Sequence, residues 1–274
     1  MEQLVVTADG IGRVEGTGIH LLDLPHPDLG ALLADGGWAA ADAAATRATV
    51  ALDEATLRPP LPGPLAIWGI GLNYRAKAAT AGRVLPTEPI LFLKPSTALA
   101  APGAVLPVPT PRPAELDYEA ELALVIGAPL HEAGPDEAWA AVAGIAPAND
   151  MTARDVMRDT TNPTLAKGFM GFSPLGPSIA DARGLDDTLD LRIRSWVEGE
   201  ERQDGRTSDL IFAVSDLLSR LSRYALLRPG DVVLTGTPPG TGQDLGRFLT
   251  DGQEVVVEVE GLLPLRNTLG SPTP

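Results

Sequence analysis

The chain has 274 residues, 44% of them hydrophobic and 21% charged, so it can bury a core as one large domain or as a large domain with a small one. Its formal net charge of −15 argues against nucleic acid or an anionic membrane surface as a partner, because both favour a basic face. The absence of cysteine excludes disulfides, thiolate metal sites and a cysteine nucleophile.

The start of the chain predicts a strand. Residues 1–6 lack the basic start and apolar core of a secretion signal. Charges or prolines interrupt every apolar run before it reaches the roughly 18 residues of a membrane span. We therefore expect a cytoplasmic protein.

Composition divides the chain near residue 64. Residues 42–57 predict a helix, and residues 58–64 (RPPLPGP) predict a linker, because this density of proline disfavours helix and sheet interiors alike. We expect a small N-terminal domain with its linker over residues 1–64 and a catalytic domain over residues 65–274.

The larger segment is predicted to be rich in short strands. Apolar runs bounded by turns predict buried strands, and alternation over residues 189–198 predicts a half-exposed strand with a hairpin turn at 198–200. Helices are expected from Pro135 and over residues 207–224. The buried strands are predicted over residues 65–71, 90–93, 122–127 and 231–235.

Acidic residues alternate at the start of one predicted strand, at Asp117, Glu119 and Glu121. Residues two apart in a strand point to the same face, about 7 Å from one another. Like charges there are costly unless something positive lies among them, and oxygen ligands suit Mg²⁺ or Mn²⁺. The alternative is a solvated strand end, and the spacing alone leaves both interpretations open.

A second polar motif, Asn149 and Asp150, follows the apolar residues 143–148. Strand ends commonly present site residues to a loop. The alternative is that Asp150 caps a short helix beginning near Thr152.

Taken together, these segments resemble the fumarylacetoacetate hydrolase family over about residues 67–267. The resemblance implies an α+β, β-rich fold, a mixed β-sandwich roll preceded by a small N-terminal α/β domain, and a homodimer. The matching segments are residues 71–75 (GLNYR), 92–95 (FLKP), 117–122 (DYEAEL), 149–155 (NDMTARD), 167–169 (KGF), 174–177 (PLGP), 199–200 with 202–203, 229–231 (PGD) and 235–238 (TGTP).

The resemblance implies that Glu119, Glu121 and Asp150 hold a Mg²⁺ or Mn²⁺ ion. Such an ion acts as a Lewis acid on the 2-oxo group of a small acid and accepts the charge of an enolate. Cleavage of a C–C bond, decarboxylation and keto–enol conversion all pass through an enolate.

Lys167 matches the family's site lysine and is expected to pair with a substrate carboxylate or with the developing enolate oxygen. The alternative is an ordinary surface lysine. Arg154 and Thr237 are expected to position the substrate, although Arg154 can instead pair with Asp150 or Asp155.

The sequence departs from the family's hydrolases at Lys77, where they usually carry a histidine. That histidine orients water together with a glutamate, expected here at Glu88, and lysine is a poor general base unless burial lowers its pKa. Met157 and Met170 replace a glutamine and an acid, which makes the pocket less polar.

Three functions are therefore expected. The first is metal-dependent hydrolytic cleavage of a C–C bond in a small 2-oxo or β-dicarbonyl acid such as an acylpyruvate. The second is decarboxylation of oxaloacetate or a related acid, or 2-oxo/enol isomerisation, which needs no attacking water. The third is a non-catalytic protein that binds a metal and a metabolite. Specificity is expected in residues 76–89 and 155–166.

Overall fold

Strand β11 (Ala120–Ile126) lies at the centre of the molecule, and all its residues are buried. Leu122 and Leu124 pack into one hydrophobic cluster, whereas Ala123 and Val125 pack into a second. Successive residues of a strand point to opposite faces, so other elements cover both faces of β11. This double burial explains its uninterrupted apolar run.

The computed structural model describes residues 1–63 and 65–270, and β11 belongs to a sheet of eleven strands. In spatial order the strands are β4 (Thr46–Ala51), β3 (Gly18–Leu22), β2 (Gly10–Glu15), β1 (Gln3–Thr7), β15 (Ser178–Asp181), β12 (Val142–Asn149), β11, β18 (Val232–Leu234), β6 (Ile67–Gly71) and β7 (Ile90–Lys94), with β5 (Leu57–Arg58) beside β1.

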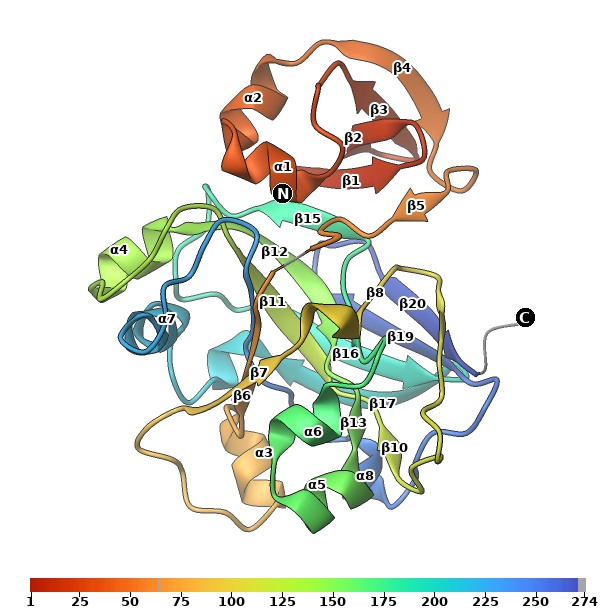
Figure 1. Cartoon of the computed structure of the whole chain (residues 1–274), viewed down its shortest axis with the longest axis vertical. Coiled ribbons are helices and arrows are strands. Elements are labelled where there is room, and N and C mark those ends of the chain that lie inside the picture. Colours follow the sequence, from red (N-terminus) through yellow and green to blue (C-terminus); the bar gives the residue numbers. More distant parts are fainter. Residues whose placement is uncertain (64, 271–274) are drawn as a thin grey trace.

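A second sheet of five strands packs against one face of the first (Figure 1). Ile193 and Val257 of this sheet share a hydrophobic cluster with Leu122 and Leu124. The order is β17 (Glu200–Arg206), β16 (Arg192–Val197), β19 (Glu254–Val259), β20 (Leu265–Leu269) and β9 (Val105–Leu106); the two small sheets pair β10 (Leu116–Asp117) with β13 (Thr152–Ala153), and β14 (Ser173–Pro174) with β8 (Leu99–Ala100).

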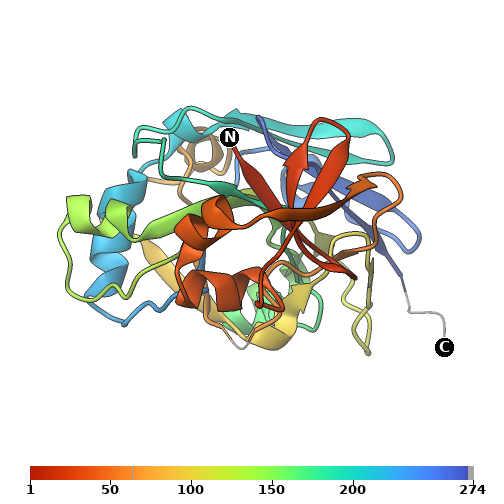
Figure 2. The ribbon, with the colours of Figure 1, turned by 90° about the horizontal axis from the view of Figure 1, so that it is seen from above.

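The helices are short and lie around the sheets (Figures 1 and 2). Their bounds are α1 (Leu29–Ala34), α2 (Gly37–Ala43), α3 (Arg75–Thr80), α4 (Pro135–Ala140), α5 (Arg154–Thr160), α6 (Pro163–Lys167), α7 (Val214–Ser222) and α8 (Gly242–Leu245), with 3-10 turns at η1 (Ser96–Ala98) and η2 (Thr207–Asp209). The expected strand-rich α+β fold is confirmed.

The N-terminal strands extend the large sheet, because β1 pairs antiparallel with β15. Figure 2, seen from above, shows α1 and α2 beside these strands. The Trp38 indole of α2 donates a hydrogen bond to the carbonyl of Ala143 in β12, at 2.7 Å. The division into two domains near residue 64 stays a prediction, and residue 64 itself lies outside the described residues.

The helix predicted over residues 42–57 is wrong. Helix α2 ends at Ala43, and β4 then pairs antiparallel with β3. Thr46, Thr49 and Val50 are β-branched, and this stiffness at χ1 favours a strand. Residues 46–51 form a strand because the edge of β3 is available for pairing.

The helix predicted over residues 207–224 is interrupted. η2 covers its start, and α7 begins only at Val214. Between them, the backbone N–H groups of Ile211 and Phe212 donate to the carbonyl and side chain of Asn73, at 2.8 and 3.1 Å. These tertiary hydrogen bonds replace the helical ones.

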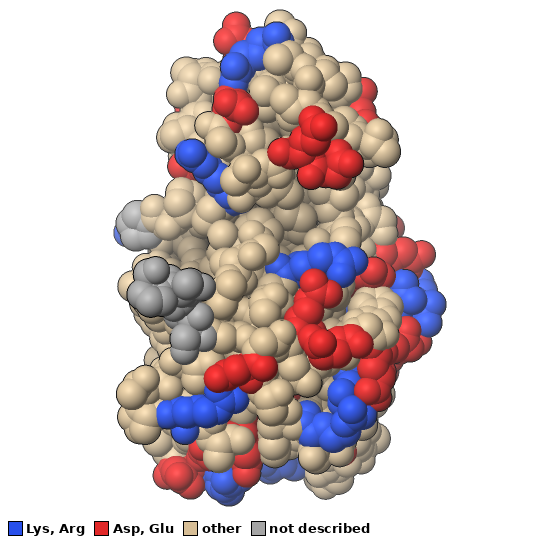
Figure 3. All heavy atoms as spheres, turned by 90° about the vertical axis from the view of Figure 1, so that its right-hand side faces the viewer, with Lys and Arg blue, Asp and Glu red and all other residues tan. Residues whose placement is uncertain are grey.

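The other sequence-predicted elements form. Strands β6, β7, β11 and β18 overlap the four predicted buried strands, and β16 with β17 forms the predicted hairpin. Burial of the strand predicted over residues 90–93 is wrong, because β7 lies at the edge of the sheet and exposes Ile90 and Leu93. The face of the molecule in Figure 3 carries acidic side chains among basic ones, so many exposed charges have a neighbour of opposite sign. Among the described residues, no helix is long and apolar enough to cross a membrane.

Candidate metal centre

The carboxylates of Glu119, Glu121 and Asp150 converge in the interior. One oxygen from each lies within 4.8 Å of those from the other two, and all three residues are buried. They meet because β11 and β12 pair antiparallel with Ala120 opposite Asn149. This register brings together residues about 30 positions apart in the sequence.

Backbone hydrogen bonds fix the two ends of this strand pair. The N–H of Asp150 donates to the carbonyl of Glu119 at 2.9 Å, and the N–H of Glu119 donates to the Asn149 side chain at 3.0 Å. Asp150 does not cap helix α5, whose N-cap is Ala153. The alternative interpretation of Asp150 as a helix cap is therefore wrong.

Two buried lysines compensate part of this negative charge. Lys167 Nζ lies 2.6 Å from Glu119 Oε2, 2.6 Å from Asp150 Oδ2 and 2.8 Å from Thr152 Oγ1. Lys94 Nζ donates to the other oxygen of Asp150 and to the carbonyl of Phe172. Lys167 is thus a buried member of the cluster, and the alternative of an ordinary surface lysine is wrong.

Glu121 stands apart from this network of ion pairs. Its Oε2 accepts a hydrogen bond from the backbone N–H of Gly236 at 2.7 Å. No basic side chain among the described residues lies within ion-pair distance of it, although Glu121 is only 1% exposed. A buried carboxylate without a positive partner is costly.

The pKa shifts reflect this difference. Burial raises the pKa of Glu121 well above its usual range, and the nearby carboxylates of Asp150 and Glu119 raise it further. Burial acts on Glu119 in the same direction, but Lys167 and Arg154 outweigh it and hold the pKa of Glu119 well below its usual range. The ionised form of Glu121 has no ion-pair partner among the described residues.

A divalent cation fits this arrangement. The three groups offer carboxylate oxygens, the ligands that Mg²⁺ and Mn²⁺ prefer. A cation bound there also supplies the positive charge that Glu121 lacks. The candidate ligands are therefore Glu119, Glu121 and Asp150.

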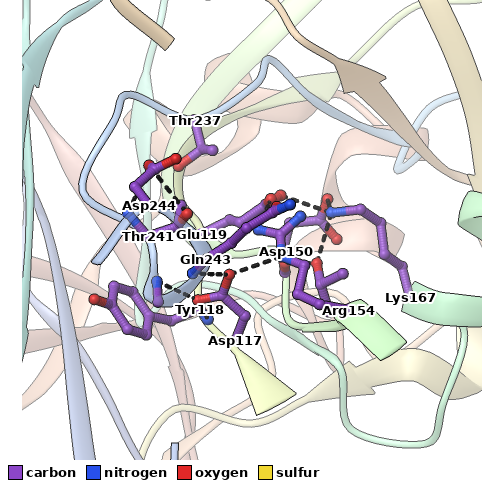
Figure 4. Close-up of polar contacts among 12 residues, drawn as sticks. Asp117, Tyr118, Glu119, Asp150, Arg154, Lys167, Thr237, Thr241, Gln243 and Asp244 are labelled. Atoms are coloured by element: carbon purple, nitrogen blue, oxygen red, sulfur yellow. Dashed lines mark hydrogen bonds and ion pairs between the residues drawn. The ribbon is translucent and has the colours of Figure 1, made fainter. Parts of the chain in front are cut away.

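Arg154 lies beside the carboxylate cluster and is held by Asp117 (Figure 4). Its Nε donates to Asp117 Oδ2 at 2.7 Å, and its Nη2 pairs with Glu119. The alternative pairing of Arg154 with Asp150 or Asp155 is not found. Asp117 also accepts hydrogen bonds from the backbone N–H groups of Gly242 and Gln243.

The cluster opens into a cavity of about 580 Å³. Its wall combines apolar side chains from β6, β7 and the helices α5 and α6 with charged groups from the cluster and from α3. It is lined by Ile70, Gly71, Leu72, Lys77, Thr80, Ala81, Arg83, Ile90, Phe92, Glu119, Glu121, Arg154, Met157, Pro163, Lys167, Thr237, Gln243 and Asp244. The cavity thus joins a candidate cation site to an apolar wall.

Comparison with known proteins agrees with this geometry. The sequence model described as fumarylacetoacetate (FAA) hydrolase C-terminal matches residues 66–270. The chain belongs to the fumarylacetoacetate hydrolase family.

Relatives in this family are named for different activities. Human mitochondrial oxaloacetate tautomerase FAHD2A is 36% identical over 213 residues, which are 76% of this chain and 68% of the relative. A bifunctional isomerase/decarboxylase of 4-hydroxyphenylacetate degradation from Salmonella dublin is 35% identical over 77% of this chain and 48% of the relative.

Solved family structures extend over nearly the whole chain. Fumarylacetoacetate hydrolase from Exiguobacterium antarcticum has a TM-score of 0.86 at 28% identity, covering 99% of this chain and 100% of that one. A 2-hydroxyhepta-2,4-diene-1,7-dioate isomerase from Mycobacterium marinum has a TM-score of 0.80 at 28% identity, covering 100% and 99%.

Lys77, at the position where the family's hydrolases usually carry histidine, lines the cavity as part of an ion pair. Its Nζ lies 2.6 Å from Asp244 Oδ2 and 2.8 Å from Thr241 Oγ1. Asp244 also accepts hydrogen bonds from the backbone N–H groups of Gly240 and Thr241. Asp244 and Lys77 lie 167 positions apart in the sequence, so local sequence patterns could not predict this ion pair.

Thr237 lines the cavity, and its expected role in positioning the substrate stays a prediction. Its hydroxyl donates to the carbonyl of Ala120 at 2.8 Å and accepts a hydrogen bond from Gln203 Nε2 at 2.8 Å. Gln203 is fully buried and also donates to the carbonyl of Pro238. Sequence reasoning included Gln203 only as part of a matching segment.

Glu88 does not reach this cavity. Its side chain is 70% exposed and pairs with Arg220 at 2.8 Å, and it is absent from the described lining. The only sequence signal for Glu88 was its place in the 76–89 segment.

Met157 lines the cavity, whereas Met170 is 65% exposed.

Lys94 is a site residue that sequence analysis included only as part of the matching segment 92–95, without a role. It is 1% exposed, and its only acidic partner among the described residues is Asp150. A lysine at the end of the apolar strand 90–94 was an available signal, because a buried lysine needs a negative partner.

Proposed function

We propose that this protein catalyses divalent-metal-dependent enolisation of a small 2-oxo acid, acting as a tautomerase or isomerase. The observation that carries the proposal is the buried triad of Glu119, Glu121 and Asp150, in which Glu121 has no basic partner among the described residues. Mg²⁺ or Mn²⁺ bound there supplies Lewis-acid stabilisation of negative charge on the 2-oxo oxygen.

Arg154 and Lys167 supply the positive field of the site. Arg154 Nη1 makes no hydrogen bond with the described residues, whereas its Nε and Nη2 are held by Asp117 and Glu119. We assign Arg154 Nη1 as a hydrogen-bond donor to the substrate carboxylate. Lys167 stabilises negative charge that develops near Glu119 and Asp150.

Lys77 and Asp244 form an acid–base pair on the cavity wall. Keto–enol conversion removes a proton from the carbon next to the 2-oxo group and delivers one to the oxygen. We assign exchange of the carbon-bound proton to this pair, with Thr237 orienting the substrate. Neither step consumes water.

Hydrolytic C–C cleavage, the first expectation from sequence, needs a group that activates water. No histidine belongs to the described cavity lining, and Glu88 pairs with Arg220 outside it. Two relatives named as a tautomerase and an isomerase/decarboxylase favour enolisation. Decarboxylation of oxaloacetate shares the enolate and is the second candidate.

The test uses metal-stripped protein with and without Mg²⁺ or Mn²⁺. The ultraviolet absorbance of oxaloacetate enol reports tautomerisation, pyruvate release reports decarboxylation, and acetate release from acetylpyruvate reports hydrolysis. The isosteric variant Glu121→Gln removes one ligand charge, and Glu132→Gln is an exposed control.

We expect metal to restore enol–keto conversion in wild type and Glu132→Gln but not in Glu121→Gln. Acetate release exceeding enol conversion would instead establish hydrolysis. Metal binding without turnover of either substrate would favour the non-catalytic alternative. A cytoplasmic homodimer remains our prediction, which light scattering tests for the oligomeric state and cell fractionation for the compartment.

A further inference from the structure

We infer that Arg83 receives a second carboxylate of the substrate, so that the site selects dicarboxylic over monocarboxylic 2-oxo acids. This inference rests on the proposed function, because it takes the first carboxylate and the 2-oxo group to lie at Arg154 and the carboxylate triad. It adds a residue of the cavity lining that determines specificity.

The first step is the charge balance of the cavity wall. Four cationic side chains line it: Lys77, Arg83, Arg154 and Lys167. Three of them already have an acidic partner, because Lys77 lies 2.6 Å from Asp244, Arg154 lies 2.7 Å from Asp117, and Lys167 lies 2.6 Å from Glu119.

Arg83 is the exception. No acidic side chain among the described residues lies within ion-pair distance of its guanidinium, and the residue is exposed at the cavity. Acidic residues outnumber basic ones 36 to 21 in this chain. A cavity arginine without an acidic neighbour is therefore available to an anion from solvent.

The backbone at Arg83 is anchored. Its N–H donates to the carbonyl of Ala78 at 2.9 Å, and the N–H of Gly82 donates to Ala79 at 3.0 Å. Gly82 has φ of 61°, a left-handed conformation that glycine adopts without strain and that commonly ends a helix. Helix α3 thus fixes where the Arg83 side chain starts.

An apolar part of the wall suits a carbon chain rather than a charge. Ile90, Phe92, Met157 and Pro163 are apolar. The distal carboxylate of a dicarboxylic acid needs a partner when it leaves water. A guanidinium meets a carboxylate with two parallel hydrogen bonds, a geometry that lysine cannot reproduce.

The experiment compares Arg83→Gln with Arg83→Lys and with Arg223→Gln. Arg223 is also exposed and has no acidic partner among the described residues, but it does not line the cavity. The kinetic arm uses oxaloacetate and its distal methyl ester. The binding arm titrates metal-loaded protein with malate and 2-hydroxybutyrate by calorimetry, because neither 2-hydroxy acid can enolise and only malate carries the distal charge.

We expect Arg83→Gln to lower kcat/KM for oxaloacetate about 10- to 100-fold and to leave the methyl ester within about twofold. The same variant should abolish the preference for malate over 2-hydroxybutyrate. Arg83→Lys should retain part of that preference, and Arg223→Gln should retain all of it.

Two outcomes separate this inference from the proposed function. If metal-dependent turnover is normal but Arg83→Gln keeps full discrimination in both arms, the inference is overturned and the proposed function stands. If no 2-oxo acid is turned over but the malate preference depends on Arg83, the dicarboxylate subsite stands and the proposed function fails.

Discussion

The ammonium of Lys167 lies 2.6 Å from Asp150 Oδ2, a carboxylate that also belongs to the candidate metal triad. A cation bound at the triad would therefore share one buried acid with a lysine. Lys94 pairs with the other oxygen of Asp150, so the acid is held from both sides. We expect this sharing to couple protein stability to metal binding.

Lys167→Met is expected to destabilise metal-stripped protein by about 3–5 kcal/mol, because it leaves the buried carboxylates of Glu119 and Asp150 short of a partner. Added Mn²⁺ should then raise the melting temperature more than in wild type, since it replaces the lost charge. Thermal unfolding in EDTA and in Mn²⁺ measures both effects. If Mn²⁺ raises the melting temperature of Lys167→Met no more than that of wild type, the shared role is contradicted. The control is Arg158→Met, because Arg158 forms an exposed pair with Glu115.

Glu121→Gln is expected to stabilise metal-stripped protein at pH 7 and to abolish its stabilisation by metal. Burial raises the pKa of Glu121, so the folded chain holds this proton to higher pH than the unfolded chain. The contribution of Glu121 to the stability of the metal-stripped wild type therefore falls as pH rises above the unfolded pKa of about 4.3.

The advantage of Glu121→Gln should accordingly be absent near about pH 4 and grow towards neutral pH. Urea unfolding of wild type and variant across this range, in EDTA, checks the sign. A variant that is less stable than wild type at pH 7 without metal shows that the ionised Glu121 already has a stabilising partner.

Lys77 and Asp244 should be energetically coupled. Their side chains are 11% and 10% exposed and join α3 to α8. We expect Lys77→Met and Asp244→Asn each to cost about 1–3 kcal/mol and to be clearly non-additive in a double-mutant cycle. The same cycle on the exposed pair Arg192 and Asp204 should give less than about 1 kcal/mol. Additive losses at Lys77 and Asp244 rule out the coupling.

Asp117→Asn should act through Arg154. Asp117 accepts hydrogen bonds from the Arg154 side chain and from the backbone of Gly242 and Gln243, so an amide there places a donor against donors. We expect KM for the 2-oxo acid to rise about tenfold while metal affinity stays within about threefold. Kinetics with Mn²⁺ titration separates the two, and a KM equal to that of wild type excludes a positioning role for Asp117.

The sequence determined much of the fold and the core of the site. The apolar run after Glu121 predicted a buried strand, and alternation predicted the β16–β17 hairpin, because the period of side chains along a strand is a local property. Motif resemblance then identified Glu119, Glu121 and Asp150, which the structure brings together.

Tertiary contacts decided the rest. The edge of β3 converted residues 46–51 from predicted helix to strand, and Asn73 took the backbone hydrogen bonds that would have continued a helix at Ile211. Spacing along one strand placed Asp117 beside Glu119, yet the break between β10 and β11 turns Asp117 towards Arg154. Local patterns carry no information about such distant partners.

Tertiary contacts also decide which basic side chains of the cavity have an acidic partner. In the sequence, Lys77 and Arg83 are two basic residues of one segment, and nothing there shows which of them has an acidic partner. Only the fold brings Asp244 to Lys77 and leaves Arg83 without an acidic partner among the described residues. Residue identity fixed which charges exist, and the packing of distant segments decided which of them are neutralised, because an ion pair depends on separation in space.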